Sequence, residues 1–312
     1  MKFGVALCTY NGERYLRAQL ESIAAQSRRP DLLVACDDAS RDGTPALLEA
    51  WAAQAPFEVR IVRNPANLGY LRNFEQAVAL CDADLVALSD QDDCWRDDKL
   101  EKLEAVFRTD AQAAAVFSDA EIVDEDLRPL GYGLLDVLRV SDAEREAARA
   151  GRLLPVLLRR NVVAGATLAL RAGWKSRLLP MPDSVVHDEW IALFAAAHGA
   201  LRFVPERLIR YRQHAANQIG ARRWNLAEHY RSLQRPRRAE NRRVLALMNR
   251  LRERLGRGDP GIEGKIAHLE RRVALPPARL LRLPAIAAEY MNGRYSRYSS
   301  GWRTAVRDLI SP

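Results

Sequence analysis

The 312-residue sequence lacks any long hydrophobic run, and no stretch comes near the roughly 18 apolar residues that a membrane-spanning helix requires. The first residues carry one positive charge before a short apolar run, with no small-residue cleavage site after it, so we expect a buried strand there and not a signal peptide. Cysteines are few, four in all, and their spacing matches no zinc-binding pattern. We expect reduced thiols in a cytoplasmic protein, although neighbouring strands would allow a disulfide between Cys8 and Cys36.

Acidic residues are scarce toward the C-terminus. From Arg222 onward the sequence has 21 Lys and Arg but only 8 Asp and Glu, a net charge of +13, whereas the remainder carries −5. The arginine pairs and singles fall at Arg222-Arg223, Arg235, Arg237-Arg238, Arg242-Arg243 and Arg271-Arg272. They alternate with Leu, Val, Trp and Tyr in an amphipathic helical pattern that breaks near residues 256–264 and at Pro276-Pro277. Two interpretations stay open: contact with an anionic membrane surface, or a solvated bundle packed on the rest of the chain.

Short apolar runs alternate with helical patterns over the first 120 residues. Strands are expected at 3–8, 32–36, 59–62, 85–88 and 113–117, with helices around 16–24, 74–81 and 100–107 and another that begins at Thr44-Pro45. This order predicts a doubly wound α/β sheet. Further on, we expect helices at 142–150 and 187–198, a strand at 165–170, and two strands, 201–204 and 207–211, separated by Pro205. The composition then changes, which predicts domains at 1–220 and 221–312.

A polar cluster follows each of the first four expected strands. These clusters are Thr9-Tyr10-Asn11-Gly12, Asp37-Asp38-Ala39-Ser40, residues 64–69 and Ser89-Asp90-Gln91-Asp92-Asp93. Doubly wound sheets bind ligands beyond the carboxyl ends of their strands, so we expect the four clusters to line one cleft.

Asp90, Asp92 and Asp93 place three carboxylates within four residues. Such groups repel one another unless a cation or hydrogen-bond donors compensate. Mg²⁺ and Mn²⁺ prefer oxygen ligands and bridge phosphate oxygens, so the cluster suits a metal–diphosphate site. A solvated acidic loop is the alternative, and the position directly after a strand argues against it.

The other candidates each have a structural alternative. Asp37-Asp38 could accept hydrogen bonds from a nucleotide base or ribose, or could form the turn before the next helix. Asn67 lies in a turn that could also line the cleft. Asp188 could cap its helix or act as a general base toward an acceptor hydroxyl. His214 could complete a metal site or lie in a surface loop.

Taken in order, the motifs resemble those of the inverting family 2 glycosyltransferases of the GT-A fold. The motifs are Cys8-Thr9-Tyr10-Asn11-Gly12, Asp37-Asp38-Ala39-Ser40-Arg41-Asp42-Gly43-Thr44, Asn67-Leu68-Gly69, Leu88-Ser89-Asp90-Gln91-Asp92-Asp93-Cys94-Trp95, His187-Asp188-Glu189-Trp190 and Tyr211-Arg212-Gln213-His214. The Ser-Asp-Gln-Asp-Asp-x-Trp form is most similar to the rhamnosyltransferase-type branch that builds bacterial surface polysaccharides. The resemblance covers residues 1–220, with a further similar stretch at 295–309. It implies a Rossmann-like nucleotide-binding domain with a mixed, mostly parallel sheet, followed by an α-helical extension.

The resemblance also implies roles for residues. Thr9, Asn11 and Glu13 match the first nucleotide-binding loop, and Asp38, with Asp37 beside it, matches the acid that contacts the base. Asn67 would line the same donor site. Asp90 and Asp92 match the DxD pair, with Asp92 as the metal ligand and Asp90 as a ribose or metal contact. His214 matches a histidine that completes the metal shell in some relatives. Asp188 matches the catalytic base, although His187 stands where the family more often has Glu.

These assignments predict a metal-dependent, inverting transfer of a sugar from a nucleotide-diphosphate donor to a hydroxyl, with Mg²⁺ or Mn²⁺ as cofactor. The resemblance to the rhamnosyltransferase-type branch suggests L-rhamnose from dTDP-rhamnose as the sugar, with galactose, glucose and N-acetylated sugars left open, and it suggests a surface-polysaccharide or lipid-linked glycan as the acceptor. We expect the enzyme in the cytoplasm or at the inner face of the cytoplasmic membrane.

Two other classes of protein share some of these sequence features. A sugar-phosphate nucleotidyltransferase is expected to carry a Gly-rich N-terminal loop, where this chain has Thr9-Tyr10-Asn11-Gly12. A nucleic-acid-binding protein would explain the arginines but not the acidic strand ends, which would repel phosphate without a metal. We therefore expect no nucleic-acid partner.

Overall fold

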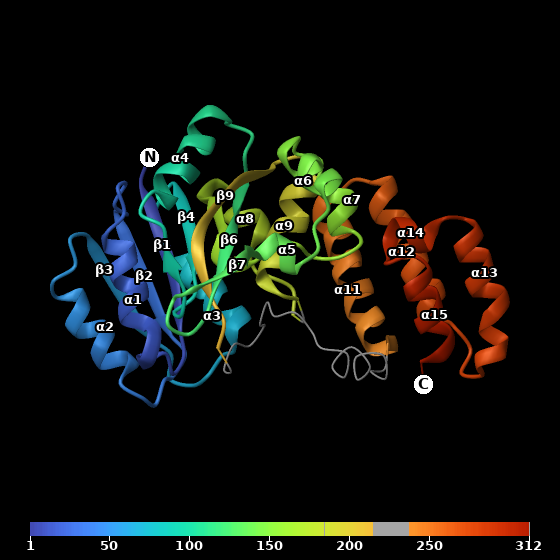
Figure 1. Cartoon of the computed structure of the whole chain (residues 1–312), viewed down its shortest axis with the longest axis horizontal. Helices are drawn as coiled ribbons and strands as arrows, with labels where there is room; N and C mark the ends of the chain where they lie inside the picture. The colour runs from blue at the N-terminus through green and yellow to red at the C-terminus, as the bar shows by residue number, and fades with distance from the viewer. Residues whose placement is uncertain (184, 215–236, 312) are drawn as a thin grey trace. The chain divides into compact units, whose positions relative to one another are not determined.

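The computed structural model describes residues 1–183, 185–214 and 237–311 (Figure 1). The chain divides into two compact units. The first comprises Met1–Gly151, Val163–Met181 and Val186–Arg222; the second comprises Arg152–Val162, Pro182–Val185 and Arg223–Pro312. The predicted domain boundary at 220 lies outside the described residues. So do the arginines at 222, 223 and 235, which the sequence placed in an amphipathic helical pattern.

The described part of the first unit is built on a nine-stranded sheet with the order β3-β2-β1-β4-β8-β6-β9-β5, and β7 pairs with β6. Its strands are β1 (Phe3–Thr9), β2 (Leu32–Asp37), β3 (Glu58–Arg63), β4 (Leu85–Ser89), β5 (Cys94–Trp95), β6 (Ala115–Val123), β7 (Pro129–Gly133), β8 (Leu168–Arg171) and β9 (Leu201–Arg212). The first four strands run parallel, and β8 joins them to β6 through antiparallel pairs. The predicted α/β fold with a mixed sheet is confirmed.

Burial explains the strand sequences. Every residue of β1, β2 and β4 is buried, as their nearly continuous apolar runs predict, whereas β3 lies at the edge of the sheet and is only partly covered. Cys8 and Cys36 are register partners on β1 and β2. Both nevertheless carry buried, unbridged thiols, as do Cys81 and Cys94.

Short helices connect the strands. They are α1 (Glu13–Ala24), α2 (Thr44–Ala52), α3 (Tyr70–Leu80), α4 (Lys99–Thr109), α5 (Leu134–Val137), α6 (Asp142–Arg149), α8 (Lys175–Leu178), α9 (His187–Ala197) and the 3₁₀ turns η1 (Gly165–Thr167) and η2 (Ala172–Trp174). In α1, Leu16, Leu20 and Ile23 are buried in the sheet core, at the helical spacing that predicted the helix. The expected strand at 165–170 is a 3₁₀ turn followed by the shorter strand β8.

The expectation of two strands around Pro205 was wrong, because β9 is one continuous strand. Val204 pairs with Ser118 and Arg207 pairs with Asp119, so two residues of β9 bulge out of the ladder. Proline has no N–H to donate, and a bulge is a place where a sheet tolerates it.

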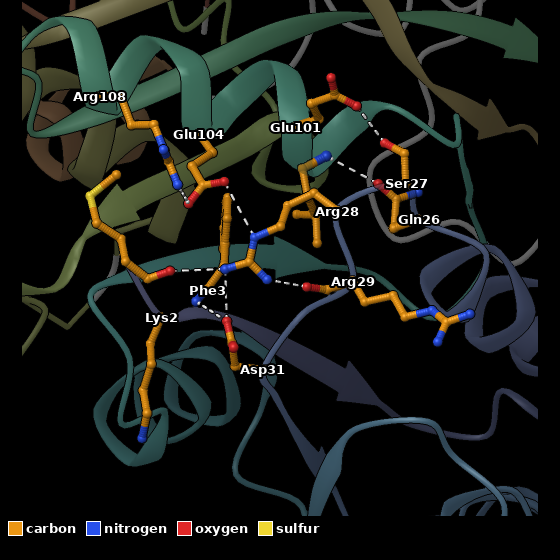
Figure 2. Close-up of polar contacts among 12 residues, drawn as sticks. Lys2, Phe3, Gln26, Ser27, Arg28, Arg29, Asp31, Glu101, Glu104 and Arg108 are labelled. Atoms are coloured by element: carbon orange, nitrogen blue, oxygen red, sulfur yellow. Dashed lines mark hydrogen bonds and ion pairs between the residues drawn. The ribbon is translucent and has the colours of Figure 1, made fainter.

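An ion-pair network lies at the amino ends of the adjacent strands β1 and β2 (Figure 2). The Arg28 guanidinium lies 2.8 Å from the Asp31 carboxylate and 3.3 Å from that of Glu104 on α4. Asp31 also accepts a 2.8 Å hydrogen bond from the backbone N–H of Phe3, where β1 begins. The network therefore joins two strand starts and a helix.

The second unit is helical in its described part. Its helices are α7 (Leu154–Leu157), α11 (Arg237–Leu255), α12 (Pro260–Val273), α13 (Leu283–Met291), α14 (Arg294–Tyr298), α15 (Trp302–Ile310) and the 3₁₀ turn η3 (Arg279–Arg282). The predicted break near 256–264 is shorter than expected, because Gly261 and Gly264 lie inside α12. A Cβ at Gly264 would come within 1.9 Å of the Tyr298 hydroxyl, so close packing explains this helical glycine. The predicted α-helical C-terminal region is confirmed.

Buried polar groups hold this unit together. Arg272 makes a two-bond contact with the Asp308 carboxylate at 2.6 and 2.9 Å, and the Tyr295 hydroxyl donates to the same carboxylate at 2.9 Å. His268 lies 2.8 Å from Glu289, and both are buried. In the part of the chain that the structure describes, no helix has both the length and the apolar composition to cross a membrane.

Candidate active site

The predicted clusters gather at the carboxyl ends of β1, β2 and β4. These strands are adjacent and parallel, and the register sets Thr9 beside Asp37 and Leu7 beside Ser89. All the residues discussed in this section belong to the first unit. The sheet thus brings residues from distant parts of the sequence to one edge.

The first loop is tied to the second by side-chain hydrogen bonds. Thr9 Oγ1 donates to Asp37 at 2.9 Å, and Asn11 Oδ1 accepts from the Arg41 backbone N–H at 2.9 Å. Glu13 Oε2 accepts from the Gly43 N–H at 2.9 Å. Asn11 has a φ of 47°, a left-handed conformation that asparagine adopts more readily than most residues. The predicted loop residues therefore fix the shape of both loops.

The carboxylates of Asp37 and Asp38 are buried, with 0% and 3% exposed, and each of their oxygens accepts a bond from the protein. The donors to Asp37 are Thr9 Oγ1 and the Ser40 hydroxyl and N–H, and those to Asp38 are Asn64 Nδ2 and the N–H groups of Leu68 and Gly69. Asp38 accordingly holds the loop that contains Asn67, whose side chain donates to the Asp38 carbonyl at 3.3 Å. Asn67 itself is exposed at the surface of this edge.

The acidic loop after β4 is short of positive charge. Burial, together with the nearby carboxylates of Asp92 and Asp188, raises the pKa of the Asp90 carboxyl to about 7, against an opposing effect of Lys99. Asp188 is therefore close enough to Asp90 to act on it electrostatically, although α9 lies almost a hundred residues later. The family resemblance implies that Asp188 belongs to the same site as this loop.

Asp92 and His214 meet directly. The Asp92 Oδ2 atom lies 2.8 Å from His214 Nε2, and the imidazole packs on the Tyr15 ring with a centroid distance of 4.6 Å. The Arg212 guanidinium donates to the Asp92 carbonyl at 2.7 Å and lies over the same tyrosine ring. The end of β9 thus positions a nitrogen ligand beside a carboxylate oxygen, a pair suited to Mn²⁺ or Mg²⁺.

Asp93 turns inward from the loop and is buried. One oxygen accepts the Arg212 N–H at 3.1 Å, whereas the other has no hydrogen-bond partner among the described residues. Burial raises the pKa of Asp93, as do Asp92 and Asp90. The nearby cation is the wholly buried Lys99, whose Nζ donates to the Ala166 carbonyl at 2.7 Å.

Asp188 lies in the first turn of α9, where its Oδ2 accepts the Gly165 N–H at 3.1 Å. The preceding residue, His187, is buried and stacks on Phe74 with a centroid distance of 4.1 Å. Neither ring nitrogen of His187 has a hydrogen-bond partner among the described residues, and burial lowers its pKa to about 4. His187 therefore packs as a neutral aromatic ring that supports the helix start.

No group of three or more His, Cys, Asp or Glu side chains converges as a metal site within residues 1–183, 185–214 and 237–311. Of the three predicted ligands, the structure pairs Asp92 with His214 and does not add Asp90 to a three-ligand set. A protein pair of this kind still fits Mg²⁺ or Mn²⁺, because such ions often take one or two protein ligands and complete their shell with water and substrate phosphates.

Comparison with known proteins agrees with this arrangement. Residues 4–156 match the model of the family described as Glycosyl transferase family 2. The chain contains a glycosyl transferase family 2 domain. The matched residues include the first three loops and the acidic loop of the site, whereas Asp188 and His214 lie beyond them.

Relatives within and around this family are distant. An uncharacterized protein of Mycobacterium tuberculosis is 27% identical over 210 residues, 66% of this chain, and the match spans 57% of that relative's length. The dTDP-rhamnosyl transferase RfbG of Shigella flexneri is 26% identical over 227 residues, 69% of this chain and 74% of the relative. Among solved structures, the mannosyltransferase PcManGT from Pyrobaculum calidifontis, in complex with GDP-Man and Mn2+, has a TM-score of 0.55 at 20% identity and covers 93% of this chain and 75% of its own. This likeness supports the GT-A-type fold.

Some residues of this family 2 site were not found from the sequence. Lys99 was missed because a lysine at a helix start, after two aspartates, is typical of an exposed position. Gly165 was missed because a backbone N–H leaves no trace in a pattern of side chains. Gln91 was named only as part of a motif, yet its amide exchanges two hydrogen bonds, of 2.8 and 3.0 Å, with the Tyr10 backbone.

Proposed function

We propose that the chain is an inverting glycosyltransferase that moves a sugar from a nucleotide-diphosphate donor to an acceptor hydroxyl. The observation that carries the proposal is that two groups with the required chemistry, a pair of metal-ligand side chains and a carboxylate, lie together at the carboxyl ends of the strands. The Asp92–His214 pair, 2.8 Å apart, supplies groups for a cation, and Asp188 supplies a carboxylate close to Asp90 in the same cluster. A metal-bound diphosphate and a base are what a single-displacement transfer needs.

The donor nucleotide would lie across the carboxyl ends of β1, β2 and β4. We assign Thr9, Asn11, Glu13 and Asn67 to the loops that receive it. Asp37 and Asp38 would act there mainly by fixing these loops, because their carboxylate oxygens already accept protein hydrogen bonds. Asp90 would contact the ribose or the metal.

Asp92 and His214 would hold Mg²⁺ or Mn²⁺. When bound, such an ion neutralises negative charge on the leaving diphosphate. The Mn2+ in the PcManGT complex supports metal use in a similar fold. The clustering of carboxylates around Asp90, seen in the raised pKa of that residue, supports a cation as the missing compensation.

Asp188 would act as the general base. It would take the proton of the acceptor hydroxyl while that oxygen bonds to the anomeric carbon and the bond from this carbon to the diphosphate breaks. One displacement inverts the configuration. The Gly165 N–H, 3.1 Å from the carboxylate, would orient Asp188 for this step.

The distant dTDP-rhamnosyl transferase supports L-rhamnose from dTDP-rhamnose as the first sugar to test. A surface-polysaccharide or lipid-linked glycan would be the acceptor. The proposed domains are a catalytic domain at 1–220 and a basic helical region at 221–312, acting in the cytoplasm and at the inner face of its membrane.

The Asp188→Asn variant tests this proposal. It should keep donor binding, measured as a thermal shift with nucleotide sugars and Mn²⁺, and should lose transfer by about a hundredfold or more, because the base is removed. Glu189→Gln, the next residue of the same helix turn, is the matched control and should retain most of the activity. Near-normal transfer by Asp188→Asn would overturn the assignment of the base, and no shift with any nucleotide sugar would overturn the transferase proposal.

A further inference from the structure

The second unit carries exposed apolar side chains concentrated in one short segment. Of the 13 exposed large hydrophobic residues in the described chain, eight lie between residues 280 and 310. The most exposed are Leu280, Leu281, Met291 and Trp302, at 78%, 66%, 85% and 61%. We call the exposed side chains of η3, α13 and α15 the apolar face.

These three elements pack against one another within the helical unit. In α15, Trp302, Val306 and Ile310 recur every four residues and are all exposed, whereas Ala305 and Asp308 point into the unit. In α13, the inward residues are Ile286 and Glu289. Each helix therefore presents an apolar side to the outside as well as to the core.

Charge on this segment has one sign. Between residues 271 and 311, all of which the structure describes, the two acids are Glu289 and Asp308, which are buried at 2% and 3% exposure. Both are bonded to arginine: Glu289 to Arg294 and Arg271, at 3.0 and 3.1 Å, and Asp308 to Arg272. The exposed charges of the segment belong to arginines, at positions 271, 279, 297 and 303.

Exposed aliphatic and aromatic groups beside arginines, with no exposed acid from 271 to 311, match an anionic lipid surface. The apolar groups enter the acyl boundary, tryptophan favours the interface, and arginine can reach the headgroup phosphates. A nucleic acid would use the arginines but not Leu280 or Met291. A second copy of this face would bring arginine against arginine.

We propose that the apolar face docks this protein on an anionic membrane surface. This moves the contact away from the arginine-rich helix that the sequence indicates. The helix α11 contributes none of the 13 exposed large hydrophobic residues of the described chain, and three of its arginines pair with glutamates: Arg243 with Glu240 at 3.0 Å, Arg250 with Glu253 at 2.9 Å and Arg252 with Glu263 at 3.4 Å. Figure 1 shows α11 and α13 well separated within the helical unit. The proposal is independent of the transfer reaction and gives it a location.

Vesicle co-sedimentation tests the proposal. The full chain should bind vesicles of phosphatidylcholine mixed with phosphatidylglycerol and should bind pure phosphatidylcholine much more weakly. Combining Leu281→Gln, Met291→Gln and Trp302→Gln should lower the affinity about tenfold or more, because apolar area no longer leaves water. The thermal midpoint should not change, since these side chains are already exposed.

Two controls make the result specific. Leu130→Gln removes an exposed leucine from the first unit, where that residue is 42% exposed, and should leave vesicle binding unchanged. Arg250→Gln on α11 should change it little. Wild-type protein that does not sediment with anionic vesicles, or a triple variant that binds as the wild type does, would overturn the proposal. A wild-type dimer that the triple variant abolishes would identify the face as a self-interface and overturn it as well. Donor-induced thermal shifts in the same samples separate this outcome from a failure of the transferase proposal.

Discussion

At the amino ends of the parallel strands the pKa of an aspartate is lowered, whereas at their carboxyl ends the pKa of another aspartate is raised. At the amino ends, Asp31 is partly buried, which raises its pKa, but the Phe3 N–H and Arg28 outweigh this effect and leave the pKa lowered. At the carboxyl ends, burial and neighbouring acids raise the pKa of Asp90 to about 7. A carboxylate whose charge is compensated by a neighbouring cation stabilises the fold. Carboxylates that repel one another, as in the acidic loop, favour the binding of a cation or a proton.

Metal removal should show the largest functional difference between the two ends of the strands. Chelation with EDTA, or Asp92→Asn, should lower transfer by about a hundredfold or more, because the leaving diphosphate keeps its charge. Mn²⁺ or Mg²⁺ should restore the chelated wild type but not the variant. Asp31→Asn at the other end is the control and should transfer at nearly the normal rate. Full activity in EDTA would show that the acidic loop works without a metal.

Lys99 is the cation behind the acidic loop, and its removal should cost stability. Burial lowers the pKa of Lys99 to about 7, while Asp93 and Asp90 oppose this shift. Lys99→Met would leave those carboxylates without the nearby positive charge and the Ala166 carbonyl without its donor, and should lower the free energy of unfolding by about 2–3 kcal/mol.

The matched control is Lys102→Met on the same helix. Lys102 is exposed and lies 3.3 Å from Glu206, so its loss should change stability by less than about 0.5 kcal/mol. Urea unfolding of both variants measures the difference. Equal losses of stability in the two variants would mean that Lys99 has no special role beside the acidic loop.

His187 should make stability depend on pH. Its pKa is lowered to about 4 in the folded chain, so between about pH 6.5 and 4 the unfolded chain binds a proton that the folded chain does not. Stability should therefore fall as the pH falls through this window, by about 3 kcal/mol from this group. His187→Gln should reduce the slope, measured by urea unfolding over a pH series. An unchanged slope would contradict the burial of a neutral ring.

Asp31 should show the smallest effect. Its pKa is lowered, so its contribution is complete above about pH 4 and is lost as the pH falls through the lowered value. The side chain is 43% exposed, so Asp31→Asn should cost no more than about 1 kcal/mol at neutral pH. The wild type and the variant should become more alike at about pH 3. A gap that widens in acid would reverse the assigned sign.

Local patterns predicted much of the fold. Strands and helices of the first unit leave short-range signatures, and the parallel order then places the four clusters at one edge. The family resemblance assigned Asp188 and His214 to the same site as the acidic loop, although they lie about a hundred residues later, and in the structure His214 is 2.8 Å from Asp92.

Features that depend on long-range packing escaped prediction. Nothing in the sequence around Pro205 shows that Asp119 pairs beyond it and keeps β9 continuous. The sequence marks Asp37 and Asp38 as polar, but only the folded loops show which way the carboxylates point. In the second unit, the arginine at 272 looked like surface charge and is buried against Asp308.

The glycine at 165 constrains how this site can change in evolution. A Cβ there would lie 2.3 Å from His187 Nε2, and that ring is buried and stacked on Phe74, so it has little room to give way. Any substitution at Gly165 would shift the helix turn that carries Asp188. In a map of mutational tolerance, Gly165 should therefore look as intolerant as the residue it supports, although it offers the reaction no side chain. Because the His187 ring fills the space that a side chain at position 165 would need, substitutions at positions 165 and 187 should occur together or not at all.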